Sequence, residues 1–127
     1  MRIALDSNAY SNAARGDSRL VKILESADEI WMPVIVVAEL RAGFLHGTQN
    51  THNESKLIQF LASPRVKILQ INEQTTHHYA RLFAFLRQQG TPIPTNDLWI
   101  AALVLQYDLP LITEDAHFKK IPQVLLL

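Results

Sequence analysis

Short apolar runs alternate with stretches of helical periodicity along this chain, and this alternation restricts the fold more than any other feature. The runs lie at Arg2–Leu5, Glu29–Met32, Val66–Leu69, Leu111–Thr113 and Val124–Leu127. Each has the length of a strand, and most of the intervening segments are long enough for helices. Parallel neighbours need long crossover connections, so strands separated by helices pair in parallel. The pattern predicts an α/β fold in which helices cover both faces of a parallel sheet.

Residues that typically cap or end helices predict where the helices lie. The expected helices are Ser7–Arg15, Asp17–Ala27, Pro33 to about His46, Asn53–Ala62, Glu73–Gln89 and Asp97–Tyr107. The fourth helix is expected to begin at a capping Asn. The fifth is amphipathic, with Tyr79, Leu82, Phe83 and Leu86 on one face, and Gly90 ends it. The sixth is apolar nearly all round, which predicts a buried helix.

The composition excludes several classes of protein. A chain of 127 residues without cysteine is expected to be a single domain, 1–127, without disulfides, thiolate catalysis or thiolate-bound zinc. No apolar run approaches the ~20 residues of a membrane span, and the N-terminus does not resemble a signal peptide, so we expect a cytoplasmic protein. The formal net charge of zero gives no sign of nucleic-acid binding. If a cation neutralised a group of acids, however, the remaining surface would be net basic.

Three aspartates lie where a parallel sheet places its functional groups, outside the carboxyl ends of the strands. Asp6 follows the first strand, Asp115 follows the strand that ends at Thr113, and Asp97 opens the buried helix. Each also has a structural interpretation. Asp6 is a good helix cap, Asp115 suits a turn, and Asp97 interacts favourably with a helix dipole.

Glu39 is more informative, because it lies within the apolar segment Val34–Leu40. A carboxylate in such a stripe is costly unless it is paired or bound to metal. A structural ion pair with Arg15 or Arg41 is one explanation. The other is that Glu39 converges with the three aspartates on a cation. Because these ligands are all oxygens, the expected ion is Mg²⁺ or Mn²⁺ rather than Zn²⁺. Such ions polarise phosphoryl oxygens and activate water.

The chain resembles PIN domains, and within them the VapC-type toxins of bacterial toxin–antitoxin pairs, over essentially its whole length. The resemblance rests on the following segments in order: Asp6-Ser7-Asn8, Glu39 in the helix after Met32-Pro33, Asn96 to Ala102, Leu111 to Phe118, and Ile121-Pro122. Four acids match the metal-binding positions of that family: Asp6, Glu39, Asp97 and Asp115. The family's polar residues beside these acids, which orient ligands or substrate, match Ser7, Asn8 and Asn96. Thr113 matches the hydroxyl that supports the fourth acid, although Glu114 adjoins Asp115 and is an alternative ligand.

The resemblance implies a three-layer α/β/α sandwich with a central parallel sheet. It further implies a Mg²⁺- or Mn²⁺-dependent endoribonuclease that leaves a 3′-hydroxyl and a 5′-phosphate. The expected partner is a VapB-type antitoxin whose C-terminal tail wraps the toxin, in a homodimer or a heteromeric toxin–antitoxin complex. The alternative function is a non-catalytic PIN fold that binds RNA or serves as a scaffold.

Other α/β classes lack their required residues here. A phosphoryl-acceptor domain needs an aspartate after the third strand, and Val66–Gln70 has none. A haloacid-dehalogenase-like phosphatase needs Asp-x-Asp where this chain has Asp6-Ser7-Asn8, and a dinucleotide-binding domain needs glycines there.

Histidines and arginines have weaker functional signals. The five histidines show no HExxH or i, i+4 metal-binding arrangement, so we expect exposed or capping side chains. His117 lies near enough to Asp115 to contact substrate. The arginines that could position RNA phosphates are Arg15, Arg41, Arg81 and Arg87.

Overall fold

The structure is a computed structural model that describes residues 1–127. Its sheet consists of four strands, β1 (Arg2–Leu5), β2 (Glu29–Pro33), β3 (Val66–Leu69) and β4 (Leu111–Ile112). The spatial order is β3-β2-β1-β4, and every neighbouring pair is parallel. The predicted parallel α/β fold is therefore confirmed.

Helices supply the crossovers that parallel pairing requires. Helices α1 (Ser7–Ala14) and α2 (Ser18–Ser26) connect β1 to β2, and α3 (Val34–His46) and α4 (Asn50–Leu61) connect β2 to β3. Helices α5 (Glu73–Gln89) and α6 (Thr95–Gln106) lead to β4, and a short 3₁₀ helix, η1 (Ala116–Lys120), follows it.

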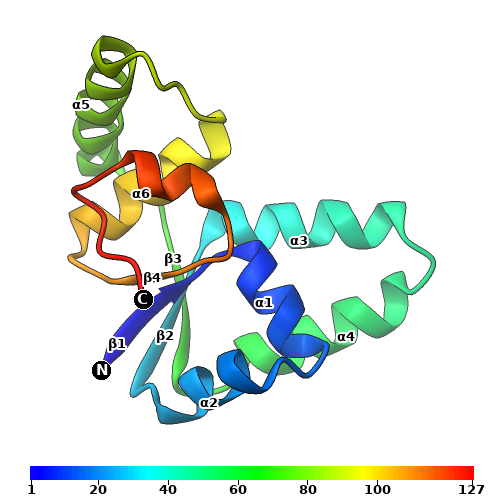
Figure 1. Ribbon diagram of the computed structural model, residues 1–127. Coiled ribbons are helices and arrows are strands. Elements are labelled where there is room, and N and C mark those ends of the chain that lie inside the picture. The colour runs from blue at the N-terminus through cyan, green and yellow to red at the C-terminus, as the bar shows by residue number, and fades with distance from the viewer.

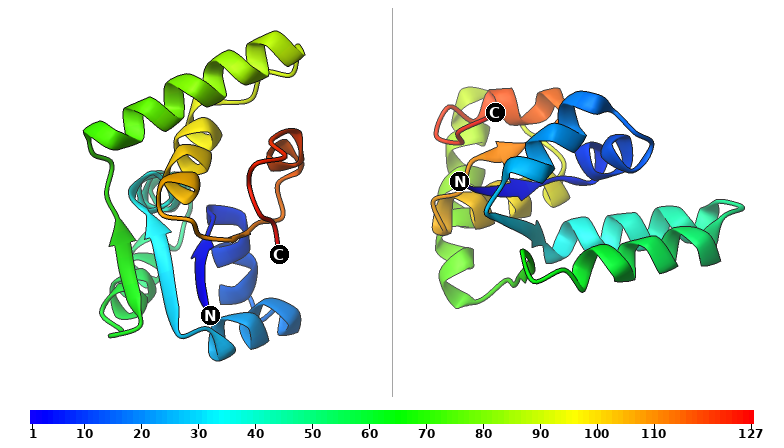
Figure 2. Two further views of the ribbon diagram at one scale, coloured as in Figure 1. Left: turned by 90° about the vertical axis from the view of Figure 1, so that its left-hand side faces the viewer. Right: turned by 90° about the horizontal axis from the view of Figure 1, so that it is seen from below.

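The helices form two outer layers. Helices α1 to α4 lie on one side of the sheet, and α5 and α6 lie on the other (Figure 1). Figure 2 shows α3 and α4 as an antiparallel pair that projects beyond the strands. This arrangement is the expected α/β/α sandwich.

The core is one continuous cluster of 29 buried apolar residues. Helix α6 contributes many of these residues, and its residues 100–104 are each at most 1% exposed. Burial of one leucine or isoleucine side chain contributes about 1.5–3 kcal/mol. The prediction of a buried helix is confirmed, and its burial fixes the position of the acid in its first turn.

Two details of the helices differ from the predictions. Helix α4 begins at Asn50, after an N-cap at Gln49 that makes no side-chain hydrogen bond, so Asn53 is not its cap. The first turn of this helix is polar and exposed, and apolar periodicity therefore could not locate it. On α5, Leu82 and Leu86 are buried, but Phe83 is 48% exposed. The face that α5 presents to α6 is too narrow to bury Phe83 as well.

The predicted strand Val124–Leu127 is wrong. Leu126 makes only an isolated parallel bridge to Leu111. Because β4 contains just two residues, it offers no edge along which a longer strand could pair.

No helix is both long and apolar enough to cross a membrane.

Candidate metal centre

The carboxyl edge of the sheet gathers the four acids that the sequence singles out. Asp6 directly follows β1, and Asp115 lies just after β4. Glu39 lies in the second turn of α3, which begins where β2 ends, and Asp97 lies in the first turn of α6. Parallel strands end at the same edge, so residues far apart in the chain meet there.

Asp6 serves as a helix cap and also faces the other acids. Its Oδ1 accepts a hydrogen bond of 3.1 Å from the backbone N–H of Ala9, and its Oδ2 accepts one from the hydroxyl of Thr113. Burial raises the pKa of Asp6 above its usual value, and the charges of Asp115 and Asp97 raise it further. The two hydrogen bonds oppose this shift. Asp6 therefore caps α1 and also lies near the other acids.

Glu39 has polar neighbours but no cation beside it. The Ser7 hydroxyl lies 3.4 Å from Oε1, and the side-chain amide of Asn96 lies 3.5 Å from Oε2. The alternative of an ion pair with arginine is wrong, because Arg41 pairs with Glu54 at 3.0 Å and Arg15 donates to Asn12. Burial raises the pKa of Glu39, and the charges of Asp97 and Asp6 act in the same direction.

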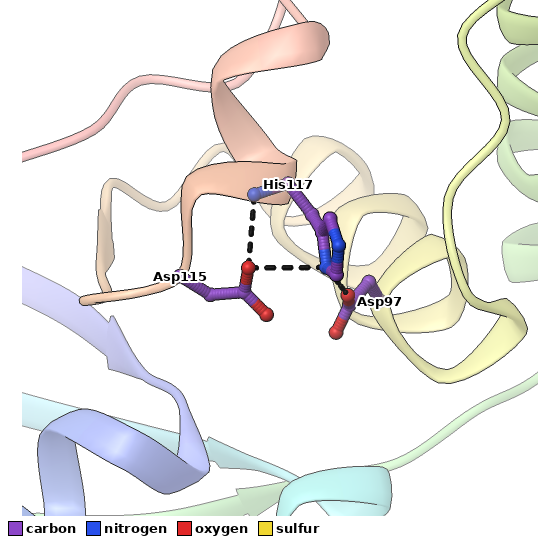
Figure 3. A group of neighbouring side chains, drawn as sticks. All are labelled: Asp97, Asp115 and His117. Atoms are coloured by element: carbon purple, nitrogen blue, oxygen red, sulfur yellow. Dashed lines mark hydrogen bonds and ion pairs between the residues drawn. The ribbon is translucent and has the colours of Figure 1, made fainter.

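Asp97, Asp115 and His117 form the tightest group, drawn in Figure 3. The Nδ1 atom of His117 lies 2.8 Å from Oδ2 of Asp97 and 3.1 Å from Oδ1 of Asp115. One ligand atom from each residue lies within 4.8 Å of the other two. Burial raises the pKa of Asp97, the hydrogen bond from His117 opposes this, and the charge of Asp115 raises it further.

The segment after β4 determines which acid joins this group. The Thr113 hydroxyl accepts a 2.9 Å hydrogen bond from the backbone N–H of Asp115 while it donates to Asp6. Asp115 then caps η1 by accepting from the N–H of His117 at 2.9 Å. Glu114 instead binds Arg19 of α2 at 2.6 Å. The structure therefore places Asp115, and not Glu114, beside Asp97 and His117.

His117 is the member of the group whose role the sequence analysis did not identify. The sequence indicates an exposed or capping histidine, with substrate contact as its functional alternative, and it predicts a ligand set of oxygens alone. In the structure, a ring nitrogen of His117 lies between the carboxylates of Asp97 and Asp115. The available signal was the spacing Asp-x-His, because an aspartate that caps a helix accepts a hydrogen bond from a backbone N–H two or three residues further on.

Asp6 and Glu39 lie outside this tight group, yet they are not independent of it. The pKa of each is raised by the charge of Asp97. Such a mutual increase is expected where carboxylates share a site without a counter-charge. Oxygen ligands in this number, with one imidazole nearby, fit a hard or borderline divalent cation such as Mg²⁺ or Mn²⁺.

A polar groove of about 440 Å³ adjoins the acids. Ser7, Asn8 and Glu39 belong to its lining. Exposed side chains from the end of α1 and from α4 also line it, namely the cationic Arg15 and Lys56 and the imidazole of His52. The groove thus connects an anionic site to a basic surface.

A parallel α/β/α sandwich with carboxylates gathered at its carboxyl edge is the arrangement that the resemblance to PIN domains implies. The chain belongs to the PIN domain family, whose model matches residues 3–124.

Within that family the chain is similar to VapC proteins. It is 39% identical to ribonuclease VapC1 of Haemophilus influenzae strain R2866 over 95 residues, which cover 74% of this chain and 69% of that protein. It is 33% identical to ribonuclease VapC2 of Rickettsia felis over 107 residues, which cover 84% and 78%.

Solved structures give the same grouping. VapBC2 from Rickettsia felis, bound to a DNA fragment from its promoter, superposes with a TM-score of 0.89 at 30% identity and covers 100% of this chain and 98% of that one. VapBC-1 from nontypeable Haemophilus influenzae superposes with a TM-score of 0.87 at 27% identity and covers 100% and 97%.

Proposed function

We propose that this chain is a divalent-metal-dependent endoribonuclease and the toxin of a VapBC-type toxin–antitoxin pair. The observation that carries the proposal is the meeting of Asp97, Asp115 and His117 beside Asp6 and Glu39, all at the carboxyl edge of the sheet. Relatives named ribonuclease VapC support the reaction class. Structural relatives that are VapBC complexes support the biological setting.

Asp6, Glu39, Asp97 and Asp115 would hold the cation. When bound, a divalent cation supplies Lewis acidity toward a phosphodiester and lowers the pKa of a bound water. The chain's own contribution is to position the acids. Thr113 and the N–H of Ala9 fix Asp6, while Ser7 and Asn96 orient Glu39. Positioning matters because displacement of a reacting group by about 1 Å costs on the order of a hundredfold in rate.

The groove beside the acids supplies a path for the substrate. Arg15 and Lys56 carry charges that suit phosphates, and Asn8 lines the groove together with Glu39. Phosphate contacts of this kind position a nucleic acid without reading its sequence. Of the four arginines considered from the sequence, Arg15 is the one that lines this groove, whereas Arg41 is engaged with Glu54.

The enzymatic proposal is tested by incubating the purified chain with single-stranded RNA. Mg²⁺ or Mn²⁺ should support cleavage and EDTA should stop it. Asp6→Asn is the matched variant, because asparagine retains the capping ability of aspartate and removes only the charge. Full activity in EDTA would overturn metal dependence. RNA binding without cleavage under all metal conditions would favour the scaffold alternative.

The toxin proposal is tested in a bacterial host. Expression of the chain alone should arrest growth, and co-expression with its cognate antitoxin should restore it. Asp6→Asn should also relieve the arrest, while a folded protein of equal abundance accumulates. Undiminished arrest by the Asp6→Asn variant would show that the growth defect has another cause.

A further inference from the structure

His117 lies where the two carboxylates of Asp97 and Asp115 approach one another (Figure 3). The backbone determines this position, because the N–H of His117 donates to the same Asp115 Oδ1 that faces the ring. The side chain of Asp97 is 11% exposed and that of Asp115 is 23% exposed, whereas the ring is 43% exposed. The Nδ1 edge of the ring therefore contacts the two carboxylates, and the rest of the ring remains accessible.

The two distances from the ring nitrogen to the carboxylates match a coordination sphere as well as a hydrogen bond. Ligands about 2.1 Å from an octahedral cation lie about 3 Å from one another. The ring nitrogen lies 2.8 Å and 3.1 Å from the two carboxylate oxygens. A cation can thus replace the hydrogen bonds with little movement of the ring, provided that Nδ1 is unprotonated when it binds.

We propose that His117 completes a mixed nitrogen–oxygen site, in which Nδ1 binds the same cation as Asp97 and Asp115 and favours Mn²⁺ over Mg²⁺. The proposal rests on the metal-dependent function proposed above. Mg²⁺ prefers oxygen ligands and retains its waters, whereas imidazole nitrogen suits transition metals. His117 is therefore a determinant of metal specificity.

The test measures metal binding directly. Pulsed electron paramagnetic resonance of the Mn²⁺ complex should show coupling to a ¹⁴N nucleus in the wild type. The coupling should vanish in His117→Ala and persist in His77→Ala, a control at an exposed histidine of α5. Calorimetric titration should show the Kd for Mn²⁺ weakened about 10–100-fold in His117→Ala, as for loss of a group that tunes a metal site. The Kd for Mg²⁺ should change less than about threefold on the same reasoning.

The outcomes distinguish this inference from the function on which it rests. Mn²⁺ binding and RNA cleavage without ¹⁴N coupling would overturn the role of His117 and leave the nuclease proposal intact. Equal weakening of both ions in His117→Ala would do the same. Failure of the wild type to bind either ion would overturn both proposals. The wild-type coupling needs no variant, so the test stands even if His117→Ala folds poorly, and His117→Gln offers a second substitution.

Discussion

Thr113 and Asp6 are 107 positions apart in the sequence, and the hydroxyl of Thr113 donates a hydrogen bond to Oδ2 of Asp6. The same hydroxyl accepts from the backbone N–H of Asp115. One side chain thus links the acid after β1 to the acid after β4. The pairing of β1 with β4 makes this possible, since Leu5 is in register with Ile112.

The link predicts different effects for two substitutions of Thr113. Thr113→Val retains the shape but leaves the Asp6 oxygen and the Asp115 N–H without a partner, so we expect RNA cleavage to fall about 10–100-fold. The free energy of unfolding should fall by about 1–3 kcal/mol. Thr113→Ser retains the hydroxyl and should remain active. Equal activity of the valine and serine variants would contradict a role for this hydroxyl in positioning the acids.

A second prediction concerns the groove that adjoins the acids. Lys56→Ala should weaken RNA binding and make it less sensitive to salt, because one phosphate contact is lost. For single strands, the slope of log affinity against log salt should decrease by about 0.7. Lys22→Ala, which removes an exposed charge on α2, is the matched control. Fluorescence anisotropy over a range of salt concentrations measures both. An unchanged slope for Lys56→Ala would remove the groove from the RNA path.

Strand and helix positions were predictable because their signals are local. The fifth helix matches its predicted range, Glu73–Gln89, since Asn72 caps it and Gly90 adopts φ 77° at its end. The extent of pairing at the C-terminus was not predictable, because it depends on how few residues β4 offers to Leu126.

The site shows the same division between local and non-local signals. Asp6 and Asp97 were identifiable because each stands at a recognisable element boundary. The partners of Glu39 were not identifiable from the sequence, because Ser7 and Asn96 approach it from other helices. Arg41 forms its ion pair with Glu54 instead. The contacts of His117 depend on the turn that Asp115 caps, and the spacing Asp-x-His alone does not place the ring beside Asp97.

A third prediction follows from the raised pKa values of Asp6, Glu39 and Asp97. A cation binds the ionised carboxylates, so binding should displace protons at pH values between their usual and raised pKa values. We expect the affinity for Mg²⁺ to fall as the pH decreases through that range. Calorimetry in two buffers of different ionisation enthalpy measures the protons released. The absence of proton release at mildly acidic pH would contradict cation binding by these groups.

The last prediction separates a shared metal site from acids that merely stabilise helices. Oxygens of Asp97 and Asp115 lie within 4.8 Å of each other. Two ionised carboxylates at that separation repel by about 3.5 kcal/mol at an effective dielectric constant near 20. Because the folded-state pKa of Asp97 is raised, its ionisation lowers the free energy of unfolding as the pH rises above the usual value of 3.8. In EDTA at neutral pH, Asp97→Asn should therefore melt at a higher temperature than the wild type. This difference should disappear below about pH 4, where the carboxyl of Asp97 is protonated in both the folded and the unfolded protein.

Mg²⁺ should reverse the order of the two proteins at neutral pH. Binding to the folded state alone raises stability by mass action, and the wild type retains the full set of acids. If Asp97 acted only on the dipole of α6, Asp97→Asn would instead lower stability by about 0.3–1 kcal/mol with or without the ion. Melting curves of both proteins at pH 4 and pH 7, in EDTA and in Mg²⁺, distinguish these accounts. A variant that is less stable than the wild type in EDTA, together with a wild type that does not respond to Mg²⁺, would exclude the shared metal site.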